Sequence, residues 1–314
     1  MSDAPPSPNS TPVAPEPSPT KVMGILNVTE DSFSDGGSNP DTSTAVCNAR
    51  AMLAAGADII DIGGESTRPG ATRVSPETEA ARVTPVVREL VTLAQDPSIP
   101  PFTTSIDTMR ASTARAALEA GATFINDVSG GLADPEMLSV CADYNCPVIL
   151  MHWDKDWGNA SAQVGAEGYR DHGTDIVTEV SNWLLARVEE AEKRGVDREN
   201  IYLDPGIGFA KSPRDNWQLL QGLGRIIDLG FPVLVGASRK RFLTALRPGL
   251  DGNPGTPESA DDATAAVTSL SAMAGAWAVR VHNVAPSKAA VDVIHAARIG
   301  DGPQVAEEWR AKRG

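Results

Sequence analysis

The sequence predicts an α/β protein of the (β/α)8 barrel class with a single domain. From Val22 onward, eight short apolar runs alternate with eight helix-like segments over roughly 280 residues, close to the ~250 residues typical of such barrels. The runs are apolar on both faces, as expected of parallel strands covered by helices. A doubly wound sheet is disfavoured, because the turn after the first run, NVTEDSFSDGG, carries no G-x-G-x-x-G fingerprint.

Local signals predict the individual elements. The predicted strands are, in chain order, VMGILNV, ADIIDIG, FTTSID, ATFINDV, PVILMH, IYLDPG, PVLVGA and WAVRVHN, and such runs favour strands. The predicted helices cover residues 44–55, 76–94, 110–120, 134–144, 175–194, 213–229, 261–274 and 286–298. N-caps are expected within residues 41–44 and at Ser75 and Ser212, each of these serines directly preceding a proline. Glycines are expected to end five helices: Gly56, Gly121, Gly195, Gly230 and Gly275.

Composition restricts the class of protein. The 314 residues carry a formal net charge of −14 and are 41% hydrophobic, as expected of a soluble globular protein. No apolar run approaches the ~18 residues of a membrane span, and the acidic balance argues against nucleic-acid binding. Residues 1–19 are rich in Pro and Ser and resemble no secretory signal, so we predict a disordered arm there. The barrel is predicted over residues 20–300 and an exposed tail over 301–314.

The chain has three cysteines, Cys47, Cys141 and Cys146. Their odd number, with no secretory signal, argues against a disulfide framework and for a reducing cytoplasm. We interpret all three as small packing residues.

Chemistry-bearing residues collect where the predicted strands end. A single polar residue at a strand end is usually a turn former or a helix cap. Here all eight strands end in this way, and the carboxyl ends of barrel strands converge on one face. In chain order these residues are Asn27; Glu65, Thr67 and Arg68; Asp107; Asn126 and Asp127; Met151 and His152; Asp204; Ser238, Arg239 and Lys240; Arg280 and His282.

The set divides by charge into two parts. The cationic part suits a phosphate or diphosphate and contains Arg68, Lys240, Arg280 and His282. The other part consists of Asp107, Asn126 and Asp204, which are expected deep in the apolar barrel. A buried carboxylate there needs a hydrogen-bond donor as partner. A flat heterocycle with an amidine edge would offer two N–H donors to Asp204, and Met151 and Phe209 could pack on its faces. The sequence therefore predicts a site for a heterocycle carrying a diphosphate.

Two further patterns could indicate a different kind of site, but each matches its motif poorly. The stretch GIGFAKS resembles a phosphate-binding P-loop, but Ala210 stands where the glycine before Lys211 is required. Asp61 and Glu65 could be a pair of hydrolytic carboxylates. Asp61 lies inside a predicted strand, however, with Arg68 nearby as a structural partner.

Taken together, the motifs resemble one family, the dihydropteroate synthases of folate biosynthesis. The matching stretches are MGILNVTEDSFSDGG, GGESTRPGA, SIDT, INDVSGG, LMHW, LDPGIGFAK, VGASRKRF and RVHNV, in the family's order. The resemblance implies a (β/α)8 transferase that joins 6-hydroxymethyl-7,8-dihydropterin diphosphate to p-aminobenzoate. The products are 7,8-dihydropteroate and diphosphate. It also implies Mg2+, inhibition by sulfonamides, a cytoplasmic location and a homodimer.

The resemblance implies a role for each matching residue. Asn27 would lie at the diphosphate and its Mg2+, with Thr67, Arg68, Arg280 and His282 completing the anion site. The pterin would be held by Asp107, Asn126, Asp204 and Lys240, with Met151 and Phe209 against its ring. The p-aminobenzoate pocket would contain Phe33, Thr67, Pro69, Ser238 and Lys240. The residues expected to act in catalysis are Asp107, Lys240, Asn27 and Arg68.

The chain departs from the family pattern at two places. Glu30 stands where proline is common, and Asn283 stands where aspartate is usual. We interpret Asn283 as orienting His282. Two alternatives remain on the sequence: a pterin-binding methyltransferase that shares Asp107, Asn126 and Asp204, and a non-catalytic pterin-binding paralogue.

Overall fold

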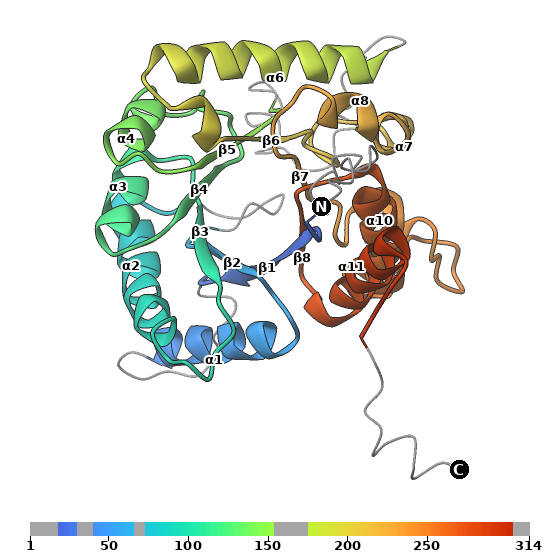
Figure 1. Ribbon diagram of the computed structural model, residues 1–314, viewed down its shortest axis with the longest axis horizontal. Helices are drawn as coiled ribbons and strands as arrows, with labels where there is room; N and C mark the ends of the chain where they lie inside the picture. The colour runs from blue at the N-terminus through green and yellow to red at the C-terminus, as the bar shows by residue number, and fades with distance from the viewer. Residues whose placement is uncertain (1–17, 30–39, 66–72, 154–174, 304–314) are drawn as a thin grey trace, which may run out of the picture.

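The computed structural model describes residues 18–29, 40–65, 73–153 and 175–303. Its centre is an eight-stranded parallel sheet in the order β6-β5-β4-β3-β2-β1-β8-β7. The strands are β1 Lys21–Asn27, β2 Ile59–Gly63, β3 Thr103–Asp107, β4 Phe124–Asp127, β5 Val148–Met151, β6 Ile201–Asp204, β7 Leu234–Val235 and β8 Ala278–Val281. A parallel bridge between Leu203 and Val233 joins the two ends of the sheet, so that the strands form a nearly closed barrel (Figure 1). The predicted fold class is confirmed.

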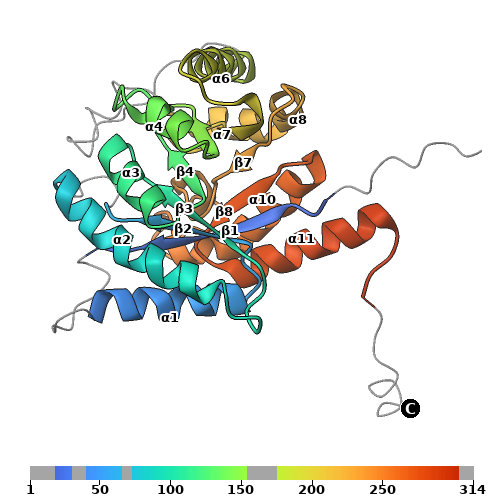
Figure 2. The ribbon, with the colours of Figure 1, turned by 60° about the vertical axis from the view of Figure 1, so that its left-hand side comes forward.

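Helices surround the barrel on the outside (Figures 1 and 2). They are α1 Pro40–Ala54, α2 Pro76–Leu93, α3 Ala111–Glu119, α4 Met137–Asp143, α6 Ile176–Lys193, α7 Pro213–Gln221, α8 Leu223–Ile227, α9 Arg241–Thr244, α10 Asp261–Ala274 and α11 Val284–Ile299. A large apolar core fills the layer between these helices and the strands. None of the described helices combines the length and the apolar character needed to span a membrane.

Most predicted helix signals are confirmed. Ser75 caps α2, and Ser212 forms a full capping box with Asp215 at the start of α7. The five glycines expected after helices all have positive φ, the conformation that glycine tolerates best. The predicted arm lies outside the described residues except for its last two positions, and so does the tail beyond residue 303.

Four details of the expected elements are wrong. The first helix begins at Pro40, before the expected cap, and the last begins at Val284. The helix expected over 213–229 is two helices that meet at Gly222, where a Cβ would lie 2.6 Å from Cγ2 of Val177. The close packing of α6 there leaves room for no side chain. The short helix α9 was not predicted.

The cysteine interpretation holds for two of the three residues. Cys141 and Cys146 are buried and all three thiols are free, but Cys47 is exposed on α1. Cys47 is therefore not a packing residue.

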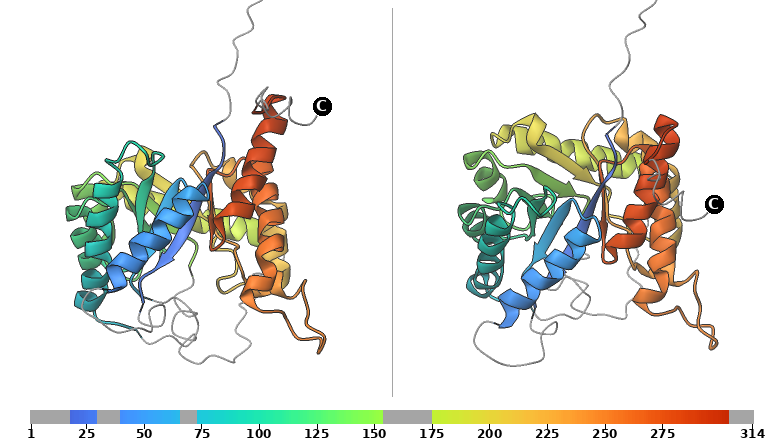
Figure 3. Two further views of the ribbon diagram at one scale, coloured as in Figure 1. Left: turned by 90° about the horizontal axis from the view of Figure 1, so that it is seen from below. Right: turned by 60° about the horizontal axis from the view of Figure 1, so that its bottom comes forward.

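The barrel interior changes from apolar to polar along its axis. Near the amino ends of the strands, the rings of Phe124, Tyr202 and Trp277 pack together with centroids 4.5–5.6 Å apart. An apolar layer of Met23, Ile59, Ile149, Leu234 and Ala278 adjoins this aromatic cluster. Because the interior is filled there, a ligand can enter only from the carboxyl ends of the strands, which lie together at the lower end of the left view of Figure 3.

Candidate active site

The predicted pterin-binding side chains lie together at the carboxyl end of the barrel. Strand register places Asn27 beside Gly63, Gly63 beside Asp107, and Asp107 beside Asn126. Asn126 is 2% exposed, whereas Asn27 is half-buried. On the next two strands around the barrel, β5 and β6, Met151 pairs with Asp204, and both are buried. The side chains expected around one heterocycle therefore lie on four neighbouring strands, β3 to β6, at the same end of the barrel, and we call this set the pterin wall.

Arg280 connects two carboxylates across this end of the barrel. Its Nε donates to Oδ2 of Asp61 at 2.6 Å, and its Nη2 donates to Oδ2 of Asp107 at 2.6 Å. Burial raises the pKa of Asp107 to about 7, with Arg280 opposing that rise and the charge of Asp61 adding to it. The two carboxylates raise the pKa of Arg280 against the effect of burial. Arg280, expected at the diphosphate, is thus also part of the pterin wall.

The loop after β6 has a specific backbone shape that places Asp204 and Phe209. Oδ1 of Asp204 accepts from the backbone N of Gly206 at 2.7 Å, and burial raises the pKa of this carboxyl. The Nζ of Lys211 donates to the carbonyls of Gly206 and Phe209 and contacts Nδ1 of His152 at 2.9 Å. The P-loop-like stretch is therefore a self-bonded loop, in which Lys211 holds the protein's own carbonyls.

Lys240, in the loop after β7, reaches the loop after β6. Its Nζ lies 4.0 Å from the centre of the Phe209 ring and donates to the carbonyl of Ile207. Burial lowers the pKa of Lys240 to about 7, against the attraction of Asp204. Gly208, at φ +78°, allows this approach because a Cβ there would overlap Cδ of Lys240. Lys240 and Phe209 thus form one wall of the predicted pterin pocket.

Ser238 and His282 form a hydrogen-bonded pair. Oγ of Ser238 lies 3.0 Å from Nδ1 of His282 and also accepts from the backbone N of His282 at 3.2 Å. The hydroxyl keeps a second lone pair and its own proton, so it can bond to Nδ1 in either imidazole tautomer. Sequence reasoning placed these residues at two different substrates. In the structure, Ser238 orients the imidazole of His282.

The interpretation of Asn283 is wrong. Its Nδ2 donates to Oδ2 of Asp261 at 3.0 Å, and Asp261 also accepts from Nε and Nη2 of Arg239. An aspartate at position 283 would face Asp261 as a like charge. Asn283 instead connects the end of β8 to the first residue of α10.

Sequence reasoning missed an ion cluster beside the second loop. Arg110 donates to Glu65 at 2.8 Å, to the carbonyl of Val74 at 2.9 Å and to the nearly buried Glu79. Glu65 also accepts from the backbone N of Val74. The cluster therefore ties residues 65 and 74 together, and Glu65 is a structural carboxylate. Asp61 is paired with Arg280, and Arg68, its expected partner, lies outside the described residues.

Four predicted site residues, Phe33, Thr67, Arg68 and Pro69, lie outside the described residues, as does Glu30.

The raised pKa of Asp107 predicts a pH-dependent stability. The carboxyl ionises near pH 3.9 in the unfolded chain and at about 7 in the folded protein. Its stabilising contribution is therefore fully present below about pH 4 and is lost as pH rises through about 7. Over this window the wild type should lose roughly 4 kcal/mol of unfolding free energy relative to Asp107→Asn. Urea denaturation of both proteins from pH 4 to 8 measures this difference, and a constant difference would contradict it.

A barrel whose open end carries buried acceptors, a cation bridging two carboxylates and a buried lysine defines an enzyme that binds a polar heterocycle. The chain belongs to the pterin-binding enzyme family, because the family model described as pterin binding enzyme matches residues 23–282. Within it, the chain is a transferase of the dihydropteroate synthase family, as its relatives show.

Among curated relatives, the dihydropteroate synthase of Mycobacterium leprae is 47% identical over 287 residues, covering 91% of this chain and 96% of that protein. The dihydropteroate synthase of Xanthomonas albilineans, solved with 4-aminobenzoic acid, is 41% identical with a TM-score of 0.77, covering 89% of this chain and 93% of that one. The same enzyme solved with 7,8-dihydropteroate has a TM-score of 0.74 at 38% identity, covering 89% and 94%.

Proposed function

We propose that this protein makes 7,8-dihydropteroate and diphosphate from 6-hydroxymethyl-7,8-dihydropterin diphosphate and p-aminobenzoate. The observation that carries the proposal is the convergence of Asp107, Asn126, Asp204, Lys240 and Arg280 at the open end of the barrel. In the reaction, the bond from the pterin methylene carbon to the diphosphate oxygen breaks. A new bond forms between this carbon and the amine nitrogen of p-aminobenzoate, and the nitrogen loses one proton.

The pterin fits the polar wall of the cavity. Asp204 offers a carboxylate to the two N–H donors of the amidine edge. The amide of Asn126 offers a donor and an acceptor on the same ring. Met151 and Phe209 provide apolar contacts for its faces, with Lys240 beside Phe209.

The diphosphate belongs at the outer side of this wall. Arg280 uses Nε and one Nη2 hydrogen for Asp61 and Asp107, and a guanidinium has five N–H donors in all. The other donors, with His282, Thr67 and Arg68, would bind phosphate oxygens.

The residues present fit Mg2+ bound together with the diphosphate. A Cβ at Gly63 would lie 3.8 Å from Oδ1 of Asn27 and 3.9 Å from Oδ2 of Asp107, so these two oxygens flank the same position between β1 and β3. The described residues contain no cluster of three or more His, Cys, Asp or Glu side chains around a possible ion. Such a sparse donor set suits Mg2+, which commonly takes its remaining ligands from substrate phosphates and water. Asn27 would hold the ion, which neutralises the departing diphosphate.

The chemical step is proposed to be SN1-like. An electron-rich dihydropterin can support a cationic methylene, and the carboxylates of Asp107 and Asp204 would stabilise that cation. An aryl amine is weakly basic and neutral, so it needs no strong base to attack. The p-aminobenzoate pocket is proposed to comprise Phe33, Thr67, Pro69, Ser238 and Lys240, with the hydroxyl of Ser238 acting there through His282.

A coupled assay for diphosphate release tests the proposed function. Release should require both p-aminobenzoate and Mg2+ and should be inhibited by a sulfonamide. Diphosphate release at the same rate with and without p-aminobenzoate would contradict the proposal. Methyl transfer from methyltetrahydrofolate would instead indicate a methyltransferase, and pterin binding without turnover would indicate a non-catalytic paralogue.

We also propose that the protein is a homodimer. A groove between α7 and α10 is lined in part by Trp217, Leu270 and Ala274. Trp217 is 38% exposed, and Leu270 and Met273 are each 57% exposed. None of the residues that line the groove is a predicted substrate-binding residue, so a second copy could cover the groove without contacting them.

Charge introduced at Leu270 in this groove and at the exposed Met273 beside it on α10 should separate the two subunits. We expect Leu270→Glu with Met273→Glu to be monomeric in analytical ultracentrifugation, because two desolvated carboxylates would face an apolar partner surface. Val293→Glu is the matched control, since Val293 is 65% exposed on α11 outside the groove. A wild type that sediments as a monomer at micromolar concentration would contradict the proposal.

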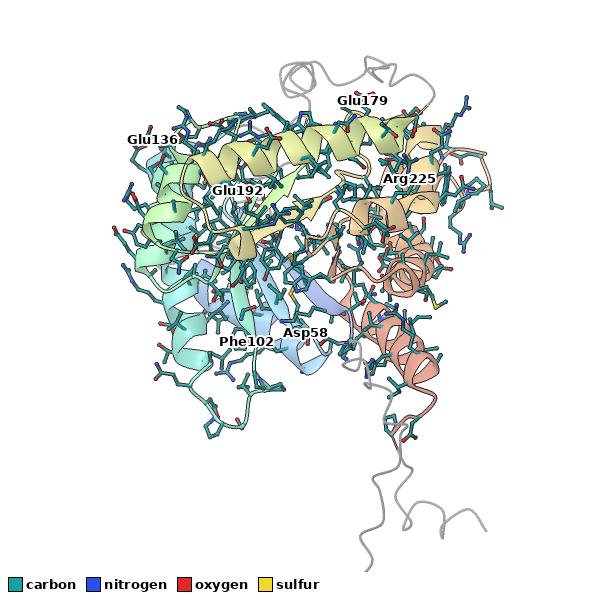
Figure 4. The ribbon with its side chains drawn as sticks, turned by 45° about the horizontal axis from the view of Figure 1, so that its top comes forward. Asp58, Phe102, Glu136, Glu179, Glu192 and Arg225 are labelled. Atoms are coloured by element: carbon teal, nitrogen blue, oxygen red, sulfur yellow. The ribbon has the colours of Figure 1, made fainter. Side chains whose placement is uncertain are left out.

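Finally, we propose a cytoplasmic location. The three free thiols, including the exposed Cys47, suit a reducing compartment. The charged outer surface suits an aqueous one, and Figure 4 shows Glu179 and Glu192 along α6 and Arg225 on α8.

A further inference from the structure

One carboxylate in the barrel interior touches two predicted substrate-binding residues at once. Asp61, on β2, is 0% exposed. Its Oδ2 accepts from Nε of Arg280 at 2.6 Å and from Nδ2 of Asn126 at 3.1 Å. Through Arg280 the same atom is linked to Asp107, which accepts from Nη2 at 2.6 Å. Three side chains of the pterin wall, from β3, β4 and β8, are therefore held by one oxygen of β2.

Stability alone does not explain this acid. A buried ion pair often contributes no more to stability than apolar residues of the same volume. Moreover, Oδ1 of Asp61 and Oγ of Ser105 have no hydrogen-bond partner among the described residues, although the two residues are neighbours in the β2–β3 register. Burying a carboxylate with one oxygen that lacks a hydrogen-bond partner lowers the free energy of unfolding, compared with an apolar side chain of the same volume.

We propose that Asp61 is a positioning residue that holds Arg280 and Asn126 in the orientations needed to bind the pterin. This inference rests on the proposed function. The amide of Asn126 has two possible orientations, and the acceptor Asp61 selects the one with Nδ2 toward β2. The amide oxygen of Asn126 is then the group offered to an N–H of the ligand.

Arg280 is fixed in the same way. Its side chain is 20% exposed, and a long cationic side chain has several rotamers available unless a partner fixes it. Asp61 holds Nε on the β2 side, so that the far end of the guanidinium reaches Asp107. The guanidinium therefore contacts both carboxylates before substrate binds. Less conformational entropy is then lost when the ligand binds.

Variants of Asp61 test this role with a pterin as the probe. We would measure the dissociation constant for 7,8-dihydropteroate by calorimetry, KM for each substrate, kcat and the thermal midpoint. Asp61→Ala should weaken pterin binding by about 100-fold, because Arg280 and Asn126 both lose the acceptor that orients them. Asp61→Asn should recover part of this loss, to about 10-fold, because its amide oxygen can still accept from Asn126 and Arg280. KM for p-aminobenzoate should not change.

Glu79→Gln is the matched control. Glu79 is 1% exposed and pairs with Arg110, which is shared with Glu65. This arrangement of one arginine and two acids copies that of Arg280 but lies outside the barrel. The control should lower the thermal midpoint and leave pterin affinity unchanged.

Two results would overturn the inference. The first is pterin affinity within threefold of wild type in Asp61→Ala or, if that variant does not fold, in Asp61→Asn. The second is an equal loss of affinity in Glu79→Gln, which would indicate general loosening. If wild type neither binds the probe nor releases diphosphate, the proposed function itself fails, and this inference fails with it.

Discussion

Asp107→Asn is expected to lower kcat by at least ~100-fold, with a much smaller change in KM for the pterin substrate. Asparagine has the same shape as aspartate, and its oxygen can still accept from Nη2 of Arg280, so the cavity should keep its geometry. What disappears is the negative charge beside the pterin methylene, where the proposed SN1-like step develops positive charge. The loss should therefore appear in the chemical step.

Single-turnover measurements with saturating pterin diphosphate separate this step from binding and product release. Asp127→Asn is the control, because Asp127 is a fully buried carboxylate in the next strand but bonds to Ser129 and Gly131 of its own turn. The control should turn over at the wild-type rate. An unchanged single-turnover rate in Asp107→Asn, with only weaker pterin binding, would refute the catalytic role.

Arg280→Met is expected to reduce kcat/KM by at least ~1,000-fold and to destabilise the fold by about 3–5 kcal/mol. Arg280 is the cation shared by Asp61 and Asp107, so its removal leaves two carboxylates in the interior without their common partner. The diphosphate also loses a proposed donor. Both effects come from one guanidinium, which explains why this substitution should be more damaging than the loss of either acid.

Arg280→Lys provides the comparison. Lysine keeps the charge but lacks the planar fork, so stability should recover more than activity. The double variant Arg280→Met with Asp61→Asn should unfold at a higher urea concentration than Arg280→Met alone, because one unpaired charge has gone. Denaturation curves and steady-state rates measure both effects. Additive losses in the double variant would contradict the idea that the two side chains stabilise each other.

The sequence was sufficient for the architecture and for the inward-facing residues at the strand ends. Strand periodicity predicts that Asp107, Asn126, Met151 and Asp204 face the same side of their strands, because side chains alternate across a strand. Their meeting in one wall then follows from closure of the barrel. Similarly, glycine after a helix predicts a left-handed turn from local sterics alone.

Pairings across the barrel could not be predicted in this way. Asp61 and Arg280 are 219 positions apart, and no local pattern tells which of several cations an interior acid will choose. Nearness in sequence suggested Arg68 for Asp61, and proximity again suggested His282 for Asn283. In each case the partner depends on side-chain reach across neighbouring strands and helices. The division of one expected helix at Gly222 likewise depends on contact with α6.

The barrel has a weak seam between its sixth and seventh strands. Strand β7 has two residues, and its link to β6 consists of the Leu203–Val233 bridge, in which the carbonyl of Pro232 accepts from the backbone N of Leu203. Asp204 follows one side of this seam, and the loop carrying Lys240 follows the other. Local opening of the barrel should therefore begin here, with early loss of amide-exchange protection at Leu203. A pterin bound to both Asp204 and Lys240 would connect the end of β6 to the loop after β7. Bound substrate would therefore stabilise the closed form of the barrel.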